Sequence, residues 1–188
     1  MIFSDYTEES MENFDAVLAN YGVERTDGIV IEGDSQHYAQ MPYYLVPTVN
    51  STDAISDFAS KGYYVLMPYA QGIKQTDNLR DTVTVNSLLT TSDSAYSKVD
   101  VNSGSIDKTD DDVDGPFDLG VSITETLDDD KETQIVYYTS SNLMDSQINQ
   151  MVSGGNEQMI MSSLNWMCSS DETSVISVPS QKPAAFPI

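Results

Sequence analysis

A strand followed by a helix is the clearest pattern of apolar and polar positions in the chain. Residues 134–139 form a β-branched and aromatic run that predicts a buried strand, and residues 140–142 form a polar turn after it. Four apolar residues then recur at helical spacing and predict a helix over residues 157–167: Met159, Ile160, Leu164 and Met167. A buried strand that leads through a polar turn into a core-facing helix is the repeating unit of an open α/β sheet.

Similar patterns occur along the rest of the chain. Helices are predicted over residues 8–20 and 52–60, each followed by a glycine that suits a helix C-terminus. Further strands are predicted over residues 23–31, 63–67, 82–90 and 116–124. The charged turn 128–131 joins the last of these to the strand at residue 134 as an antiparallel hairpin. We therefore predict an open α/β sheet, mostly parallel with an antiparallel edge hairpin. It forms one domain over residues 1–178, with a proline-rich exit linker over residues 179–188.

The charge and cysteine content exclude several classes of function. The 188 residues include 30 acidic and 8 basic side chains, a net charge of -22 that repels phosphate backbones, so we expect no nucleic-acid partner. The single cysteine, Cys168, excludes an intramolecular disulfide and a cysteine-based structural zinc site. No apolar run approaches the roughly 20 residues that span a bilayer, and the N-terminus has no signal-peptide pattern. The chain itself is therefore expected to be soluble.

Several short motifs occur in an order that points to a known family. They are Leu-Ala-Asn-Tyr-Gly-Val at 18–23, Asp-Gly-Ile-Val at 27–30, Val-Leu-Met-Pro at 65–68, Leu-Leu-Thr-Thr-Ser at 88–92, Asp-Gly-Pro-Phe-Asp-Leu at 114–119, Gly-Asn at 155–156 and Leu-Asn-Trp at 164–166. In this order, over nearly the whole chain, they resemble the extracytoplasmic domain of the gliding-motility-type auxiliary component of bacterial ABC transporters.

The resemblance implies a setting and a fold. It implies a Rossmann-like, glutamine-amidotransferase-like α/β domain on the extracytoplasmic face of the bacterial cell membrane. In that family, transmembrane helices anchor the parent protein beside an ABC permease and an ATPase. The family's first strand and both membrane helices are missing here, so we expect a soluble fragment of a membrane-anchored parent. A sheet edge left unpaired by the missing strand would allow a homodimer.

Catalysis of the amidotransferase type lacks the residues that it needs. That chemistry requires a cysteine nucleophile on a strand-to-helix turn, with a histidine base beside it. The turn at residues 68–72 reads Pro-Tyr-Ala-Gln-Gly and contains no nucleophile. Cys168 follows the last predicted helix and His37 lies in a distant predicted loop, so activity would require the fold to bring the two within hydrogen-bond reach. We expect no enzyme activity, and a buried or half-buried structural thiol at Cys168.

Two other groups of residues are candidate binding sites. Polar and aromatic side chains at the carboxyl ends of predicted strands would form a ligand-binding crest: Tyr69, Gln71, Ser141 and Asn142. Residues 110–115 contain the D-x-D-x-D-G opening of a calcium loop, with carboxylates at Asp110, Asp112 and Asp114. The twelfth position is Val121 where a bidentate glutamate is needed, so a solvated acidic loop is favoured over a Ca²⁺ site. Asn156 is predicted to be an N-cap, and no other cofactor is expected.

These observations favour one function and leave an alternative. The favoured function is a non-enzymatic extracytoplasmic domain of an ABC-transporter-associated membrane protein that acts through protein-protein or substrate contacts. The alternative is a small-ligand or carbohydrate-binding α/β module that uses the crest. The two differ in whether the crest is open or is filled by the chain's own side chains.

Overall fold

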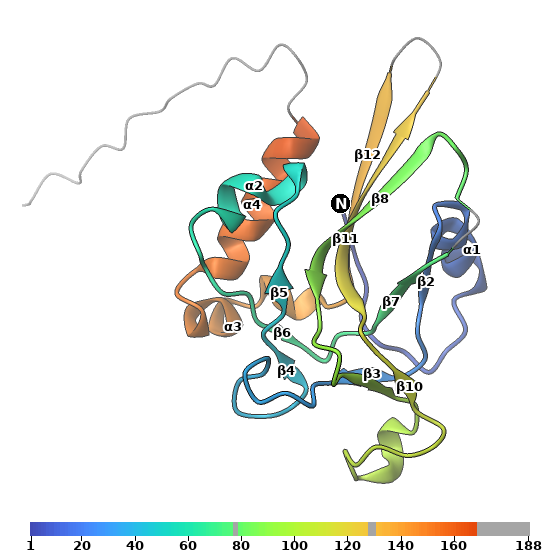
Figure 1. The fold of residues 1–188 in the computed structure, drawn as a ribbon, viewed down its shortest axis with the longest axis vertical. Helices are drawn as coiled ribbons and strands as arrows, with labels where there is room; N and C mark the ends of the chain where they lie inside the picture. The colour runs from blue at the N-terminus through green and yellow to red at the C-terminus, as the bar shows by residue number, and fades with distance from the viewer. Residues whose placement is uncertain (77–78, 128–130, 169–188) are drawn as a thin grey trace, which may run out of the picture.

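The main sheet contains seven strands in the part of the chain that the structure describes. This computed structural model describes residues 1–76, 79–127 and 131–168. The strands are β1 (Ile2–Phe3), β2 (Val23–Arg25), β5 (Thr48–Val49), β7 (Ile73–Gln75), β8 (Val83–Thr90), β11 (Asp118–Thr126) and β12 (Glu132–Tyr138). The long strand β11 lies between β12 and β8, and β1 extends the sheet beyond β12 (Figure 1). β7 pairs with the start of β11 and β2 pairs with β7, while β5 pairs with β8.

The predicted Rossmann-like, mostly parallel sheet is wrong. β11 pairs antiparallel with β12, β8 and β7, and the pairs β2–β7 and β5–β8 are antiparallel as well. β1 and β12 form the parallel pair of this sheet. Each parallel pair needs a crossover connection, usually a helix, whereas antiparallel neighbours need only a short loop. No α-helix occurs among the described residues between β8 and β11, so these long strands form a curled, mostly antiparallel half-barrel.

The predicted strand at residues 63–67 is also absent from the main sheet. Only Met67–Pro68 form a strand, β6, which pairs with β4 (Tyr44–Leu45) in a separate two-stranded sheet. The backbone of the buried Leu66 is paired instead with a side chain. Its N–H donates to Asn156 Oδ1 and its C=O accepts from Asn156 Nδ2, each at 2.9 Å. Asn156 is therefore not an N-cap but takes the place of a neighbouring strand at Leu66.

A second small sheet lies at one end of the main sheet. It contains β3 (Ile29–Ile31), β9 (Tyr96–Lys98) and β10 (Val113–Asp114), and η2 (Val101–Ser103) follows β9 (Figure 1). The strand predicted over residues 23–31 is divided between β2 and β3 by Gly28, which has a φ of +80°. A Cβ at Gly28 would lie 2.0 Å from the carbonyl oxygen of Lys98, so the close approach to β9 requires glycine.

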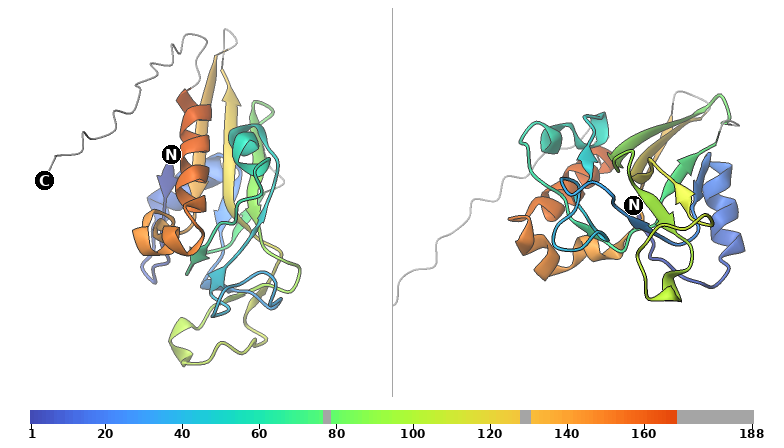
Figure 2. Two further views of the ribbon diagram at one scale, coloured as in Figure 1. Left: turned by 90° about the vertical axis from the view of Figure 1, so that its left-hand side faces the viewer. Right: turned by 60° about the horizontal axis from the view of Figure 1, so that its bottom comes forward.

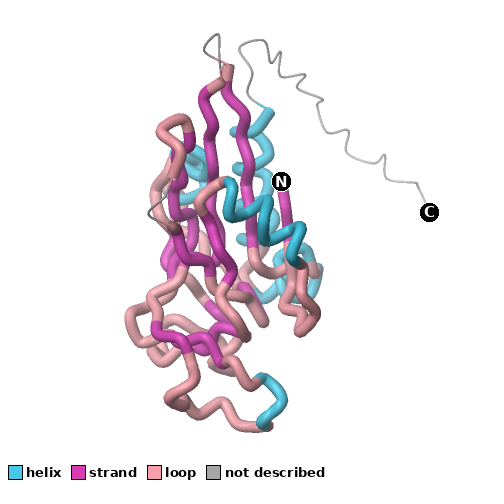
Figure 3. The backbone as a smooth tube through the Cα atoms, turned by 90° about the vertical axis from the view of Figure 1, so that its right-hand side faces the viewer, coloured by secondary structure: helices cyan, strands magenta, loops and turns pink. Residues whose placement is uncertain are grey.

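Helices cover both faces of the main sheet. Besides η2, the helical elements of the described residues are α1 (Glu12–Asn20), η1 (Asp53–Ile55), α2 (Ser56–Ala59), η4 (Ser141–Met144), α3 (Ser146–Met151) and α4 (Gly155–Cys168). α2 and α4 lie side by side on one face, and α1 lies against the other (Figures 2 and 3). Side chains alternate along β12 accordingly: Val136 and Tyr138 pack in the same core cluster as Met159 of α4, while Tyr137 packs in a second cluster with Leu18 of α1.

The edge of the sheet at β12 is only partly covered. β1 pairs with Tyr137 and Tyr138, and no other described strand lies beside residues 132–136 on that side. The N–H of Ser4 donates to the Tyr138 carbonyl at 3.1 Å, so the backbone groups of Tyr138 point toward β1. Backbone groups at every second residue point the same way, and Gln134 therefore presents its N–H and C=O at this edge. A homodimer through the edge stays a prediction.

Two sequence-based expectations concern the membrane and the C-terminus. None of the helices in the described ranges is long and apolar enough to cross a membrane. The predicted exit linker at residues 179–188 lies outside the described residues, as does most of the charged turn at 128–131.

Candidate functional site: an acidic cleft beside α1

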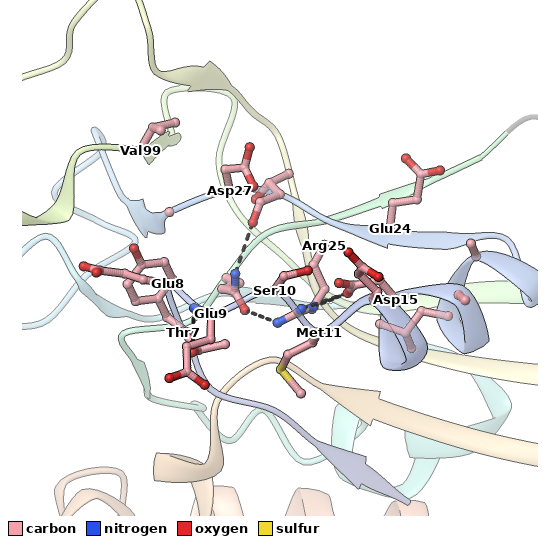
Figure 4. Close-up of a pocket in the computed structure, with 18 residues that line it drawn as sticks. Thr7, Glu8, Glu9, Ser10, Met11, Asp15, Glu24, Arg25, Asp27 and Val99 are labelled. Carbon is pink, nitrogen blue, oxygen red and sulfur yellow. Dashed lines mark hydrogen bonds and ion pairs between the residues drawn. The ribbon is translucent and has the colours of Figure 1, made fainter.

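A large cavity lies between α1, the segment before it and the strand β2. It has a volume of about 890 Å³ and is lined mainly by residues 6–19 and 24–28, with Gln71 and Val99 contributed from elsewhere. Six carboxylate side chains line it: Glu8, Glu9, Glu12, Asp15, Glu24 and Asp27. We call this cavity the acidic cleft. Figure 4 shows Arg25 directed toward Asp15, with Glu8, Glu9 and Asp27 on the other side of the arginine.

Arg25 lies at the base of the acidic cleft, where its side chain is 8% exposed. Its Nε donates to Asp15 Oδ1 at 2.9 Å, and a terminal nitrogen lies 2.8 Å from the same oxygen. The other terminal nitrogen donates to Gln71 Oε1 at 2.9 Å, and the guanidinium lies 5.4 Å from the ring centroid of Phe14. Gln71 in turn donates to the carbonyl oxygen of Thr26 at 3.2 Å. These contacts fix the guanidinium in place and partly neutralise it.

The acidic cleft carries a strong excess of negative charge. Arg25 is the one basic residue among the described residues that line it, against six carboxylates. Burial and the nearby carboxylates of Glu8, Asp27 and Asp100 raise the pKa of Tyr6 at the rim, so its phenol stays neutral at physiological pH. A concave surface lined by charges of one sign concentrates ions of the opposite sign. The acidic cleft is therefore suited to a positively charged group.

The predicted crest is occupied by contacts within the chain. Ser141 donates its hydroxyl to Asp5 Oδ2 at 2.6 Å and its N–H to Asp5 Oδ1 at 2.8 Å. Asn142 Nδ2 lies 3.5 Å from the carbonyl oxygen of Pro68, so both residues do lie near the segment that carries Tyr69 and Gln71. The side chain of Gln71 lies in the acidic cleft and none of the other three lines it. The four residues therefore do not form one common pocket.

Tyr69 belongs instead to a cluster of three tyrosines, in which Tyr69 is exposed and Tyr43 and Tyr44 are partly buried. Its ring is 44% exposed and is stacked on Tyr43, with centroids 4.9 Å apart and planes at 19°. Tyr44 contacts it edge-on at 5.9 Å. Burial raises the pKa of Tyr69, and electrostatic and hydrogen-bond interactions with the phenols of Tyr43 and Tyr44 raise it further. Tyr69 has a φ of 55°, which is uncommon and strained for an aromatic residue.

The three aspartates of the predicted calcium loop do not converge on one point. Asp112 forms a buried ion pair with Lys98 at 3.0 Å, with side chains 1% and 4% exposed, and it accepts hydrogen bonds from the N–H groups of Thr109 and Val99. Burial opposes ionisation of Asp112, but these three donors outweigh it and lower its pKa to about 2. Asp114 pairs with Lys108 at the surface. Across the described ranges, no group of three or more histidine, cysteine or acidic side chains is arranged to hold a metal ion.

Cys168 and His37 lie far apart in the fold. Cys168 is the last residue of α4, whereas the carbonyl of His37 accepts from Val46 N, next to β4. The C-terminal end of α4 and the strand β4 lie at opposite ends of the molecule (Figures 1 and 2). The expectation of a buried or half-buried thiol is wrong, because Cys168 is exposed. The structure therefore does not assemble the Cys-His pair that an amidotransferase mechanism would use.

The fold defines a class, namely a mixed α/β domain built on a curled, mostly antiparallel sheet. No family model and no curated protein match the chain. A solved structure described as the mmIFT52 N-terminal domain is similar, with a TM-score of 0.54 and 13% sequence identity. The match covers 86% of this chain and 60% of that one, so the chain spans less than two thirds of its length. At this identity the similarity concerns the fold alone.

Sequence reasoning missed most of the acidic cleft. Of the four crest residues, Gln71 is the one that lines the cleft. A signal was present in the sequence, since the helix pattern at residues 8–20 places several carboxylates just before the isolated Arg25. What the pattern could not show is that β2 folds back against α1, so that Arg25 meets Asp15.

Proposed function

We propose that the chain is a non-enzymatic, extracytoplasmic domain of a membrane-anchored protein that works beside an ABC permease and an ATPase. It binds a positively charged region of a partner protein or of the transported substrate in the acidic cleft. The ordered motifs of the sequence support the transporter setting. The observation that supports this mode of binding is the acidic cleft, where six carboxylates surround a single, partly neutralised arginine.

The carboxylates at the rim are available for such a ligand. Glu9, Glu24 and Asp27 are exposed side chains that line the acidic cleft. Asp15 differs from them because it is held by Arg25. A lysine or arginine side chain that enters between the rim residues gives up contacts with water and gains contacts with several carboxylates. The net charge of -22 adds a long-range attraction for such a group.

The test is co-purification of the tagged full-length parent from its own membranes, with its partners identified by mass spectrometry. We expect the permease and the ATPase to be recovered. Neutralising Glu9, Glu24 and Asp27 together, as Gln, Gln and Asn, is expected to reduce this recovery about tenfold, since each exposed charge contact contributes up to about 1 kcal/mol. Recovery of the parent alone, or with cytosolic enzymes, would contradict the proposal.

A matched variant controls for the change in overall charge. Asp81→Asn, Asp93→Asn and Glu132→Gln remove the same number of exposed carboxylates outside the acidic cleft. This triple variant is expected to recover partners like the wild type. Equal losses in both variants would mean that the net charge, and not the acidic cleft, attracts the partner.

A second candidate, carbohydrate binding, is favoured by the tyrosine cluster. The ring centroids of Tyr43, Tyr44 and Tyr69 lie 4.9 to 5.9 Å apart, so no ligand fits between them. A ligand must therefore lie flat on the outer face of Tyr69, as the apolar face of a sugar ring does, with phenol hydroxyls beside it for hydrogen bonds. The specific observation is that Tyr69 combines a strained, left-handed backbone with an exposed aromatic ring.

Titration with neutral hexasaccharides of glucose and of N-acetylglucosamine tests this candidate. Tyr69→Asn removes the ring and keeps a residue that tolerates positive φ, and it is expected to weaken binding at least tenfold. Tyr64→Asn is the matched control, because Tyr64 is 70% exposed and lies outside the cluster. Absence of saturable binding to the wild-type chain at millimolar sugar would rule out the candidate. Neutral sugars keep this test independent of the charged cleft.

A further inference from the structure

A second concave surface lies on the opposite side of the molecule from the acidic cleft. It is a groove of about 290 Å³ between η4, α3 and α4, whereas α1 lies on the far side of the sheet (Figures 1 and 3). The buried Leu143 and the partly buried Ile160 line it together with Met144 and Met161, which are 58% and 48% exposed. Leu164, one turn beyond Ile160 on the same face of α4, is 36% exposed. We call this surface the methionine groove.

The exposed apolar residues of α4 are not explained by the fold of the chain. Met159 and Ser163 are fully buried against the core. A helix on the surface of a globular protein normally carries polar residues on its outer face. α4 instead carries Met161 and Leu164 there, so it has a second apolar face. Among the described residues, nothing covers this second face.

The three helical elements that form the methionine groove carry charges of one sign. Residues 141–168, which form η4, α3 and α4, contain Asp145 and Glu157 and no lysine, arginine or histidine. Asp145 Oδ1 accepts from Gln147 N and Ile148 N at the start of α3, and Asn149 holds Glu157 at 3.3 Å. Both carboxylates are thus fixed at the rim of an apolar surface. The rest of the chain, with its net charge of -22, adds to the negative potential.

We propose that the methionine groove binds an amphipathic helix of a partner protein, with apolar residues on one face and lysine or arginine residues beside them. Apolar side chains at positions i and i+4 of such a helix enter between Met144 and Met161 and contact Ile160. Methionine suits this role because its flexible, polarisable side chain adapts to the shape of the inserted group. The basic flanks lie near Asp145 and Glu157. A second copy of this chain is a poorer occupant, because it brings another 30 carboxylates.

A leucine-lysine peptide tests the proposal directly. The probe is a fluorescent 14-residue peptide whose leucines recur at helical spacing, and the full chain is titrated into it at about 0.3 M NaCl, where long-range attraction is screened. We expect saturable binding with a gain of peptide helicity. A scrambled peptide of the same composition and charge is expected to bind at least tenfold more weakly, because it has no continuous apolar face.

Substitutions in the chain place the peptide in the methionine groove. Met161→Gln is expected to weaken binding about tenfold, because it replaces an apolar contact by a polar one of similar size. Met41→Gln is the matched control, since Met41 is 50% exposed and lies outside the methionine groove. The methyl NMR signals of Met144 and Met161 should shift on titration, whereas that of Met41 should not.

Three outcomes would overturn the proposal. The first is equal binding of the scrambled and amphipathic peptides, which would indicate attraction by charge alone. The second is equal affinity of the Met161→Gln and Met41→Gln variants. The third is a combined result: the chain sediments as a dimer, Met161→Gln converts it to a monomer, and no peptide binds. In that case the methionine groove binds a second copy of the chain. The variant in which Glu9, Glu24 and Asp27 are neutralised should bind the peptide like the wild type. A failure of this proposal can therefore be distinguished from a failure of the proposed function.

Discussion

Replacing Lys98 by methionine should lower the free energy of unfolding by about 3–5 kcal/mol. The ammonium group of Lys98 lies 3.0 Å from Asp112 Oδ2, and both side chains are almost completely buried. Lys98 also donates to the carbonyl oxygen of Asp107 at 2.8 Å, so it ties the acidic loop to β9. The variant leaves a buried carboxylate without its cation, which is why the loss is large. Urea denaturation followed by circular dichroism measures it.

Lys108→Met provides the control for this result. Lys108 and Asp114 form an ion pair whose side chains are 49% and 74% exposed. An exposed pair of this kind contributes between zero and about 1 kcal/mol, so this variant should remain close to the wild type. If Lys98→Met and Lys108→Met lowered the free energy of unfolding by similar amounts, the burial of the Lys98–Asp112 pair would not account for its contribution to stability.

The pH dependence of stability provides a second check of the same ion pair. The pKa of Asp112 is lowered from 3.8 to about 2 in the folded chain. Its ionised form therefore stabilises the fold fully above about pH 4, and this contribution is lost as the pH falls from 4 toward 2. Asp112→Asn should be less stable than the wild type at pH 6, and the difference should shrink across that window. A difference that stays constant down to pH 2 would contradict the assignment.

Replacing Asn156 by alanine should cost about 2–4 kcal/mol of stability. The side chain of Asn156 is fully buried and forms two hydrogen bonds of 2.9 Å with the backbone of Leu66. Alanine leaves a buried N–H and a buried C=O without partners, and each such group costs about 1–3 kcal/mol. The midpoint of thermal or urea unfolding reports the loss. Asn149→Ala is the control, because its partner is the exposed Glu157, and an equal loss there would refute the argument.

The local elements were largely predictable from the sequence. The periodic pattern at residues 157–167 corresponds to α4 (Gly155–Cys168), and the pattern at 8–20 contains α1 (Glu12–Asn20). The predicted hairpin strands correspond to β11 and β12, which do pair antiparallel. β11 lies inside the sheet, however, because β8 pairs along its other side. Short-range patterns of apolar and polar side chains therefore predicted the positions of these helices and strands, because the periodicity of each element is a local property of the chain.

The strand directions and the site were not predictable in the same way. Each depends on contacts between residues far apart in the sequence, such as Asn156 with Leu66 or Arg25 with Gln71. The apolar run at residues 63–67 looks like a buried strand because Val65, Leu66 and Met67 are indeed buried. A pattern of buried residues does not show whether the backbone of that segment pairs with a neighbouring strand or with a side chain from a helix. The acidic loop is a similar case. Its pattern favours a solvated loop over a cation site, and neither prediction includes the buried ion pair of Asp112 with Lys98.

The pairing of β1 with β12 has a consequence for folding during synthesis. Ile2 and Phe3 pair with Tyr137 and Tyr138, so strands from opposite ends of the described chain are neighbours in the sheet. During synthesis, Ile2 and Phe3 therefore have no partner in the sheet until the residues of β12 have emerged from the ribosome. Closing such a long loop is slow compared with forming local helices and hairpins. During that interval the apolar side chains of β1 are exposed, and chaperones that recognise short extended segments have their best opportunity to bind.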